Sequence, residues 1–88
     1  MIIGTMIIEI YGKDNCAYCD RAVALAQQVV QESHHKYEYF KHGRDFTTHD
    51  LLEKFPNART FPQIRIDGRN IGGYTDFQKL ITKITDGI

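Results

Sequence analysis

Two cysteines separated by two residues, Cys16-Ala17-Tyr18-Cys19, constrain this chain more than any other feature of its sequence. They follow a short run of β-branched residues, 6–11, and precede a stretch in which apolar residues recur with helical spacing. The unpaired N–H groups and the dipole at a helix start favour negative charge on the first cysteine. Such a position lowers the pKa of a cysteine from about 8.5 to roughly 3.5–7.5 and so produces the nucleophilic thiolate. The motif therefore indicates redox chemistry.

Length and charge fit one small globular domain. The chain has 88 residues, a formal net charge of zero and two cysteines. Balanced charge gives no basic field for nucleic acid or an anionic membrane, so neither is an expected partner. Residues 1–11 lack the features of a signal peptide, and no stretch reaches the roughly 20 apolar residues of a membrane helix. We therefore expect a single cytoplasmic domain, residues 1–88, in which a Cys-x-x-Cys pair is catalytic or metal-binding.

The first predicted helix begins at Ala17 and continues to about Ser33. Its apolar positions follow the spacing of one buried stripe and comprise Ala22, Leu25, Ala26, Val29 and Val30. Extending this stripe backwards reaches Cys19, so we expect Cys19 to be buried and Cys16 to be exposed at the helix start. This asymmetry suits a nucleophile and a second thiol that resolves its intermediates.

Residues 36–41 alternate around aromatic side chains and predict a second strand. A strand, a helix and a strand in this order predict a right-handed βαβ unit with parallel strands. Next, Thr47 is expected to cap a short helix, with a hydrophobic staple from Phe46 to Leu51 and Pro56 as its end. The predicted apolar face of this helix consists of Leu51, Leu52 and Phe55.

Residues 63–71 predict a hairpin that turns at Asp67-Gly68. A last helix is expected with Thr75 as its N-cap, in a capping box with Gln78, and with Gly87 as its end. Its apolar stripe consists of Phe77, Leu80, Ile81 and Ile84. The predicted order is β-α-β-α-β-β-α, and residues 1–5 extend the first strand, fray or are dispensable.

The segment Thr60-Phe61-Pro62 lies directly before this hairpin. A cis Phe61–Pro62 bond would offer the backbone N–H and C=O of Phe61 beside the cysteines, where an extended peptide could pair with them. Only about 5–6% of X–Pro bonds are cis, so these residues by themselves favour a trans bond.

Residues 72–76, Gly-Gly-Tyr-Thr-Asp, allow a ligand to approach the backbone and the start of the last helix. A carboxylate would suit the helix N-terminus and an ammonium would suit Asp76, so the α-carbon of a γ-glutamyl unit fits both. The alternative is an ordinary glycine-rich loop.

Lys13 stabilises the thiolate of Cys16, binds a ligand carboxylate or is simply solvated. Arg59 is a weaker candidate of the same kind, and Tyr18 either packs over the site or covers the helix end.

A zinc site is not expected from the histidines, because adjacent histidines do not reproduce the spacing of a zinc finger. All four are predicted to lie on the surface: His34, His35, His42 and His49.

These motifs, in this order, resemble the glutaredoxin family over nearly the whole chain from Met6. The family pattern is Lys-x-x-Cys-Pro-Tyr-Cys, then Thr-Val-Pro, then Gly-Gly followed within three residues by Asp. The matching residues are Lys13, Cys16, Tyr18, Cys19, Thr60, Pro62, Gly72, Gly73 and Asp76. The resemblance implies a thioredoxin-like α/β fold with a four-stranded mixed sheet, helices on both faces and a cis bond before Pro62.

The resemblance also implies a glutathione-dependent thiol–disulfide oxidoreductase that serves electron transport and cell redox homeostasis. Cys16 would be the nucleophile and Cys19 the resolving thiol of the redox-active centre. Glutathione would be the co-substrate, and no metal is expected. The implied glutathione contacts are Lys13, Tyr18, Thr60, Phe61, Pro62, Gly73, Thr75 and Asp76. The implied partners are disulfide-bearing or glutathionylated proteins, ribonucleotide reductase among them. We expect a monomer, because nothing in the sequence asks for a dimer.

Two residues depart from the family pattern. Ala17 replaces a proline and Phe61 replaces a valine, and the residues do not decide their effect on redox potential or specificity. Three alternative functions stay open: an electron donor reduced by a thioredoxin reductase, a carrier of a glutathione-ligated [2Fe–2S] cluster, and a structural zinc module.

Overall fold

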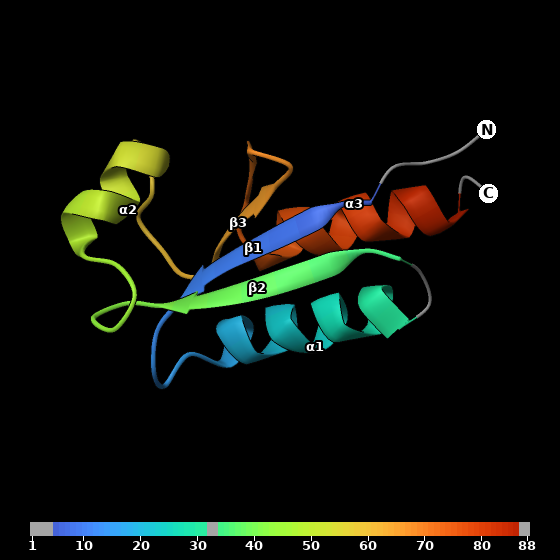
Figure 1. Cartoon of the computed structure of the whole chain (residues 1–88), viewed down its shortest axis with the longest axis horizontal. Helices are drawn as coiled ribbons and strands as arrows, with labels where there is room; N and C mark the ends of the chain where they lie inside the picture. The colour runs from blue at the N-terminus through green and yellow to red at the C-terminus, as the bar shows by residue number, and fades with distance from the viewer. Residues whose placement is uncertain (1–4, 32–33, 87–88) are drawn as a thin grey trace.

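The computed structural model describes residues 5–31 and 34–86 and contains seven elements (Figure 1). They are β1 (Ile7–Gly12), α1 (Ala17–Gln31), β2 (Lys36–Lys41), α2 (Thr48–Lys54), β3 (Gln63–Ile66), β4 (Arg69–Gly72) and α3 (Tyr74–Asp86). This order is the predicted one, with β1 shifted by one residue along the chain. Ser33, Gly87 and residues 1–4, for which we made predictions, lie outside the described residues. No helix in the described ranges is long and apolar enough to cross a membrane.

The four strands form one mixed sheet in the order β2-β1-β3-β4. β1 runs parallel to β2, as the βαβ prediction requires, and antiparallel to β3, which in turn pairs antiparallel with β4. Asp67 and Gly68 at the hairpin tip have φ angles of 51° and 81°, the left-handed conformation that a tight two-residue turn needs. The predicted thioredoxin-like sheet is therefore confirmed.

Helices cover both faces of this sheet. Side chains alternate along β1, so Ile8 and Ile10 face α1 and α3, whereas Tyr11 faces the opposite side and α2. The first core contains Ile8, Ile10, Ala22, Ala26, Ile64, Ile66 and Phe77. The second core contains Tyr11, Phe46, Leu51 and Phe55. The sheet thus separates two cores, and the ends of β1 and β2 lie where α1 begins (Figure 1).

The predicted cap of α2 is confirmed. The backbone N–H of Asp50 donates to Oγ1 of Thr47 at 3.1 Å, and the backbone N–H of Thr47 donates to Oδ2 of Asp50 at 2.9 Å. Leu51 is buried in the second core with Phe46, as the staple predicts. The prediction for Leu52 is wrong, because this side chain is 42% exposed. Consecutive residues of a helix point about 100° apart, so both leucines cannot face one core.

The predicted N-cap of α3 is also wrong. The helix begins at Tyr74, one residue before Thr75, and the backbone N–H of Phe77 donates to the carbonyl oxygen of Gly73 at 3.0 Å. Gly73 is therefore the N-cap, and its N–H donates to Oδ2 of Asp76 at 3.2 Å. Of the predicted apolar stripe, Phe77 is fully buried and Ile84 is 43% exposed.

Candidate active site

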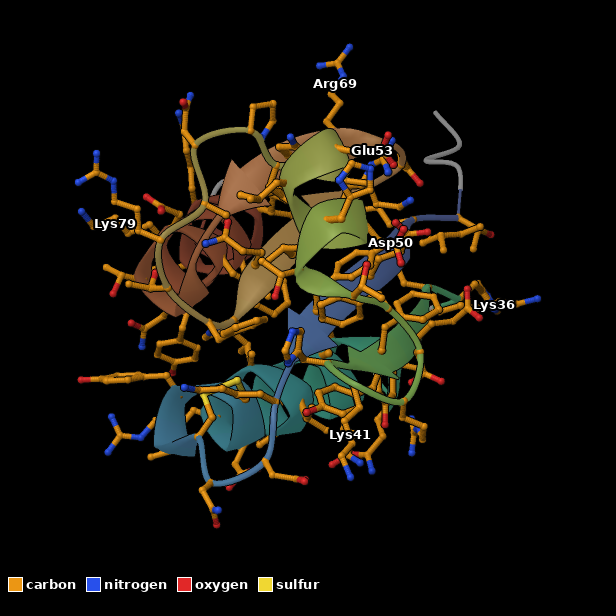
Figure 2. All side chains as sticks on the ribbon, turned by 90° about the vertical axis from the view of Figure 1, so that its left-hand side faces the viewer. Lys36, Lys41, Asp50, Glu53, Arg69 and Lys79 are labelled. Atoms are coloured by element: carbon orange, nitrogen blue, oxygen red, sulfur yellow. A yellow bond between two sulfur atoms is a disulfide. The ribbon has the colours of Figure 1, made fainter. Side chains whose placement is uncertain are left out.

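The two cysteines are joined by a disulfide where α1 begins, with their Cα atoms 5.2 Å apart. Figure 2, which looks at this end of the molecule, shows the sulfur–sulfur bond in yellow. Cys19 is fully buried and Cys16 is partly exposed, which is the predicted asymmetry. An incoming disulfide can therefore reach only the first sulfur from solvent.

The start of α1 directs a hydrogen-bond donor at the accessible sulfur. The backbone N–H of Asp20 donates to the carbonyl oxygen of Cys16 at 3.1 Å, so Cys16 occupies the N-cap position. The backbone N–H of Cys19 donates to Sγ of Cys16 at 3.2 Å. An N–H group at this position lowers the free energy of a negative charge on that sulfur once the disulfide is reduced. The helix start thus favours the thiolate form of Cys16.

Gly12, at the end of β1, leaves space for Sγ of Cys19. Gly12 is not among the site residues predicted from the sequence. A Cβ at Gly12 would lie 3.1 Å from Sγ of Cys19 and 2.7 Å from the hydroxyl oxygen of Tyr39. A side chain at this position would therefore displace the sulfur, the phenol or both. A glycine within a strand pattern, which often marks close approach of other groups, was the available signal.

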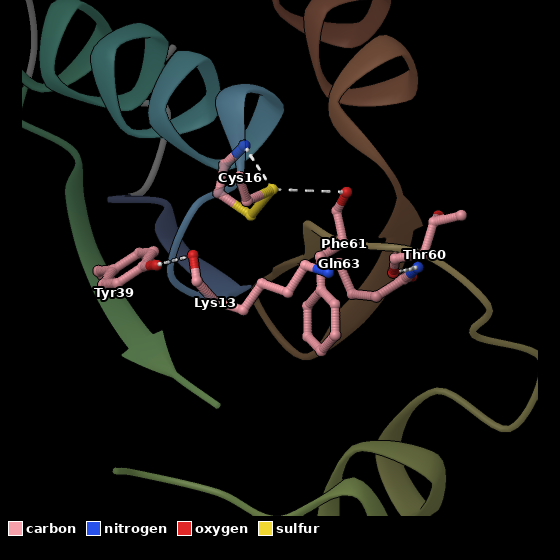
Figure 3. Close-up of a disulfide and its surroundings, with 7 residues drawn as sticks. Lys13, Cys16, Tyr39, Thr60, Phe61 and Gln63 are labelled. Atoms are coloured by element: carbon pink, nitrogen blue, oxygen red, sulfur yellow. Dashed lines mark hydrogen bonds between the residues drawn. A yellow bond between two sulfur atoms is a disulfide. The ribbon is translucent and has the colours of Figure 1, made fainter. Parts of the chain in front are cut away.

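The Phe61–Pro62 peptide bond is cis, as the resemblance implies and against the expectation from the residues alone. The carbonyl oxygen of Phe61 lies 3.9 Å from Sγ of Cys16 (Figure 3). Nε2 of Gln63 donates to the carbonyl oxygen of Thr60 at 2.7 Å, which ties this loop to β3. Within this loop, Pro62 is buried and Thr60 is exposed. An extended backbone lying along this loop would meet the Phe61 carbonyl next to the disulfide.

The side chain of Phe61 packs away from the sulfur. Its ring centroid lies 5.7 Å from that of His42 and 6.2 Å from that of Phe46. Nζ of Lys13 lies 5.6 Å from the same centroid, close enough for a cation–π contact. Lys13, which is exposed, is thereby held at the edge of the site. Arg59 is exposed as well.

The start of α3 forms the other border of the site. A Cβ at Gly73 would lie 3.6 Å from the carbonyl oxygen of Pro62, so this backbone touches the cis-proline loop. Gly72 has a φ of 123°, and a Cβ on it would collide with the carboxylate of Asp76. Thr75 and Asp76 are exposed on the first turn. Gly73 and Pro62 thus join the first turn of α3 to the loop beside the disulfide.

Tyr18 lies between the two cysteines in sequence but turns outwards. It is 53% exposed, and its ring centroid lies 5.9 Å from that of Tyr74 on α3. The Cζ atom of Arg21 lies 5.1 Å from the Tyr18 ring centroid. Tyr18 therefore links α1 to the start of α3 and remains open to solvent.

A hollow of about 430 Å³ lies between the loop after β1, α1 and β2. Its lining residues are Lys13, Asp14, Asn15, Asp20, Val23, Tyr39 and Lys41. Nζ of Lys41 lies 3.1 Å from Oδ2 of Asp14 at its rim. Burial, followed by the charges of Asp20 and Asp14, raises the pKa of Tyr39 above 10.0. The phenol therefore stays protonated at neutral pH.

Within residues 5–31 and 34–86, no three His, Cys, Asp or Glu side chains gather closely enough to hold a metal ion. All four histidines were predicted to lie on the surface: His34 and His49 are exposed, and His35 and His42 are half-buried. Nδ1 of His35 accepts the backbone N–H of Met6 at 2.8 Å, and Nε2 of His42 lies 2.9 Å from Oγ1 of Thr48.

Known proteins are similar to this chain in sequence and in structure. The family model described as Glutaredoxin matches residues 8–71. Glutaredoxin 1 of Escherichia coli K12 is 36% identical over 80 residues, which cover 88% of this chain and 94% of that protein. Glutaredoxin of Haemophilus influenzae is 38% identical over 79 residues, covering 86% and 91%.

Solved structures agree with this comparison. Reduced E. coli glutaredoxin has a TM-score of 0.81 at 35% identity, covering 91% of this chain and 98% of that chain. The buckwheat glutaredoxin–glutathione complex has a TM-score of 0.61 at 26% identity, covering 91% and 69%.

Proposed function

Because this chain belongs to the glutaredoxin family and is a thiol–disulfide oxidoreductase, we propose that it uses glutathione to reduce protein disulfides and glutathione mixed disulfides. The observation that supports this most is the unequal environment of the two sulfurs. Cys16 is partly exposed and receives the N–H of Cys19, whereas Cys19 is fully buried behind it. One thiol can therefore meet substrate, and the other can react only with the intermediate held at the first.

In the proposed reaction the Cys16 thiolate attacks one sulfur of the substrate disulfide and forms a mixed disulfide. The bond between the two substrate sulfurs breaks, and the second sulfur leaves with the electron pair as a thiolate. When the attached group is a protein, the thiolate of Cys19 attacks Cys16, forms the intramolecular disulfide and releases that protein. Two molecules of glutathione then return both cysteines to thiols and leave as glutathione disulfide.

Glutathione fits the border of the site by its charges and its backbone. Its cysteinyl unit would pair with the backbone of Phe61, beside Cys16. Its γ-glutamyl carboxylate would meet the unpaired N–H groups of the first turn of α3, where Thr75 lies, and its ammonium would meet Asp76. Its glycine carboxylate would lie near Lys13, with Tyr18 and Thr60 at the margin. A buckwheat relative was solved as a glutathione complex, which supports this proposal.

The test is reduction of a glutathionylated peptide, coupled to NADPH and glutathione reductase, by the wild type, Cys16→Ser and Cys19→Ser. We expect turnover by the wild type and Cys19→Ser, and none by Cys16→Ser, because this substrate needs only the first thiol. With an intramolecular protein disulfide as substrate, Cys19→Ser should instead stop at a trapped mixed disulfide.

Absence of turnover by reduced, folded wild type would reject glutathione as co-substrate, and thioredoxin reductase would then be assayed as the reductant. Visible absorbance after anaerobic purification would indicate the cluster-carrier alternative. The mixed disulfides trapped by Cys19→Ser in a cytoplasmic extract identify the protein recipients, and ribonucleotide reductase is the one proposed by family analogy.

A further inference from the structure

The buried cysteine has to lose a proton before it can react. Cys19 is fully buried, and burial raises the pKa of a thiol because the charged form loses its hydration. The resolving step proposed above nevertheless requires Cys19 as a thiolate. A hydrogen-bond donor near Sγ of Cys19 would lower the free energy of that thiolate.

Tyr39 on β2 is placed to be this donor. Its hydroxyl oxygen and Sγ of Cys19 border the same small space in front of Gly12, as the 2.7 Å and 3.1 Å contacts of a Cβ built there show. In the disulfide form the hydroxyl donates to the carbonyl oxygen of Lys13 at 3.5 Å (Figure 3). That distance is long for an O–H···O hydrogen bond, so little free energy is lost when the hydroxyl turns to another acceptor.

We propose that Tyr39 assists the second half of the reaction, where its hydroxyl donates a hydrogen bond to the Cys19 thiolate. This inference rests on the resolving role of Cys19 proposed above. In this step Cys19 first gives its proton to water. Its sulfur then bonds to Sγ of Cys16, and the bond from Cys16 to the substrate sulfur breaks. The substrate leaves as a thiolate with that electron pair and takes a proton from solvent.

The surroundings of Tyr39 support the role of donor rather than base. Asp20 faces it from α1, Asp14 and Lys13 from the loop after β1, Lys41 from β2 and Arg44 from the segment after β2. Burial and the two carboxylates together raise the pKa of the phenol, so it keeps its proton at neutral pH. Tyr39 also lines the 430 Å³ hollow described above, together with Asp14, Asp20, Lys13 and Lys41.

The experiment uses the fully reduced protein and 5,5′-dithiobis(2-nitrobenzoate), a symmetric aromatic disulfide whose released thiolate is coloured. Attack by Cys16 releases the first thionitrobenzoate in a phase that depends on reagent concentration. Attack by Cys19 releases the second in a phase that does not. Stopped-flow recording from pH 5 to 10 therefore gives the apparent pKa of Cys19 in the mixed disulfide without any use of glutathione.

For Tyr39→Phe we expect an unchanged first phase and a second phase whose pH midpoint rises by about one unit. The second phase should be about threefold slower below the midpoint, since a more basic thiolate is also more nucleophilic (Brønsted slope about 0.4–0.5). For the same reason, the second phase of Tyr39→Phe should be faster than that of the wild type at high pH. Tyr37→Phe is the matched control, because the Tyr37 hydroxyl accepts from Nε2 of Gln27 instead, and it should change neither phase.

An unchanged midpoint in Tyr39→Phe would overturn the proposal, as would equal slowing at every pH, which indicates only disturbed packing. The ¹³Cβ chemical shift of Cys19, followed against pH by NMR in the reduced Cys16→Ser protein with and without Tyr39→Phe, gives a second measurement of the effect on the Cys19 pKa and needs no reagent to reach the buried sulfur. This pKa must rise by a similar amount. Suppose the wild type shows no turnover in the glutathione-coupled assay but still releases thionitrobenzoate in two phases. That result would reject the glutathione proposal and leave the proposal for Tyr39 standing.

Discussion

The carbonyl oxygen of Phe61 lies 3.9 Å from Sγ of Cys16, while the ring of Phe61 packs near His42 and Phe46. One residue thus contributes its backbone to the redox site and its side chain to the edge of the second core. Because the two contributions use different atoms, mutation can separate them.

Phe61→Val should retain the chemistry and lose stability. The backbone carbonyl is unaffected, so turnover with a glutathionylated peptide should stay within about threefold of the wild type. Loss of the ring contacts should lower the free energy of unfolding by about 1–2 kcal/mol, less than a fully buried phenylalanine would cost. Urea denaturation alongside the coupled assay checks both. A loss of turnover beyond tenfold with unchanged stability would show that the ring itself contacts substrate.

Gly72→Ala should harm both the fold and the glutathione border. Its φ of 123° is strained for alanine, and the new Cβ would displace the carboxylate of Asp76. We expect a loss of about 1–3 kcal/mol in stability and a raised KM for glutathionylated peptide. Gly43→Ala is the matched control, because Gly43 also has a positive φ, 88°, but has nothing within 4 Å of its Cβ position. It should lose stability without a change in KM.

Asp76→Asn should raise the KM for a glutathionylated peptide by about three- to tenfold with little change in kcat. The asparagine oxygen can still accept the N–H of Gly73, so the first turn of α3 keeps its bond and only the charge is lost. The difference in KM between Asp76→Asn and the wild type should shrink in high salt, because salt screens the attraction between the exposed Asp76 carboxylate and the ammonium of glutathione. Glu38→Gln, an exposed acid on β2, is the control. An equal effect of Glu38→Gln would attribute the change to overall charge.

Asp50→Asn should destabilise the protein more at neutral pH than in acid. The backbone N–H of Thr47, followed by its hydroxyl, holds the pKa of Asp50 below its ordinary value of 3.8. A carboxyl whose pKa is lowered by folding contributes stability above the unfolded value, and this contribution disappears as the pH falls through the folded value. Thermal melts at pH 7 and pH 2 should therefore show a Tm difference from the wild type that is smaller at pH 2 than at pH 7. A difference of the same size at both pH values would refute the charged capping box.

Local patterns predicted most of the fold because they depend on neighbours along the chain. Helical spacing placed Cys19 inwards, and Thr47 with Asp50 predicted the start of α2. The same reasoning misplaced the start of α3, since the Gly72-Gly73 pair permits a helix start at Gly73, where Asp76 supplies the partner. A threonine followed three residues later by a glutamine was a weaker signal than this backbone freedom.

The site was less predictable because its parts come from distant segments. The motifs named Cys16, Cys19 and Pro62, but nothing in them indicated that Tyr39 and Gly12 meet beside the second sulfur. That contact depends on the register of β1 with β2, in which Gly12 pairs with Lys41. Local periodicity predicts the existence of such strands without fixing which residues become neighbours across them.

The strand order also bears on whether copies of this protein associate through the edges of their sheets. β2 lies at the margin of the sheet, and it begins with Lys36 and ends with Lys41. If two copies joined these margins in antiparallel fashion with their strands aligned, Lys36 of each would lie opposite Lys41 of the other. Like charges directly opposite one another destabilise a strand pair, and lysines are a common protection of open sheet edges. The β2 margin therefore resists aggregation by edge-to-edge growth of the sheet.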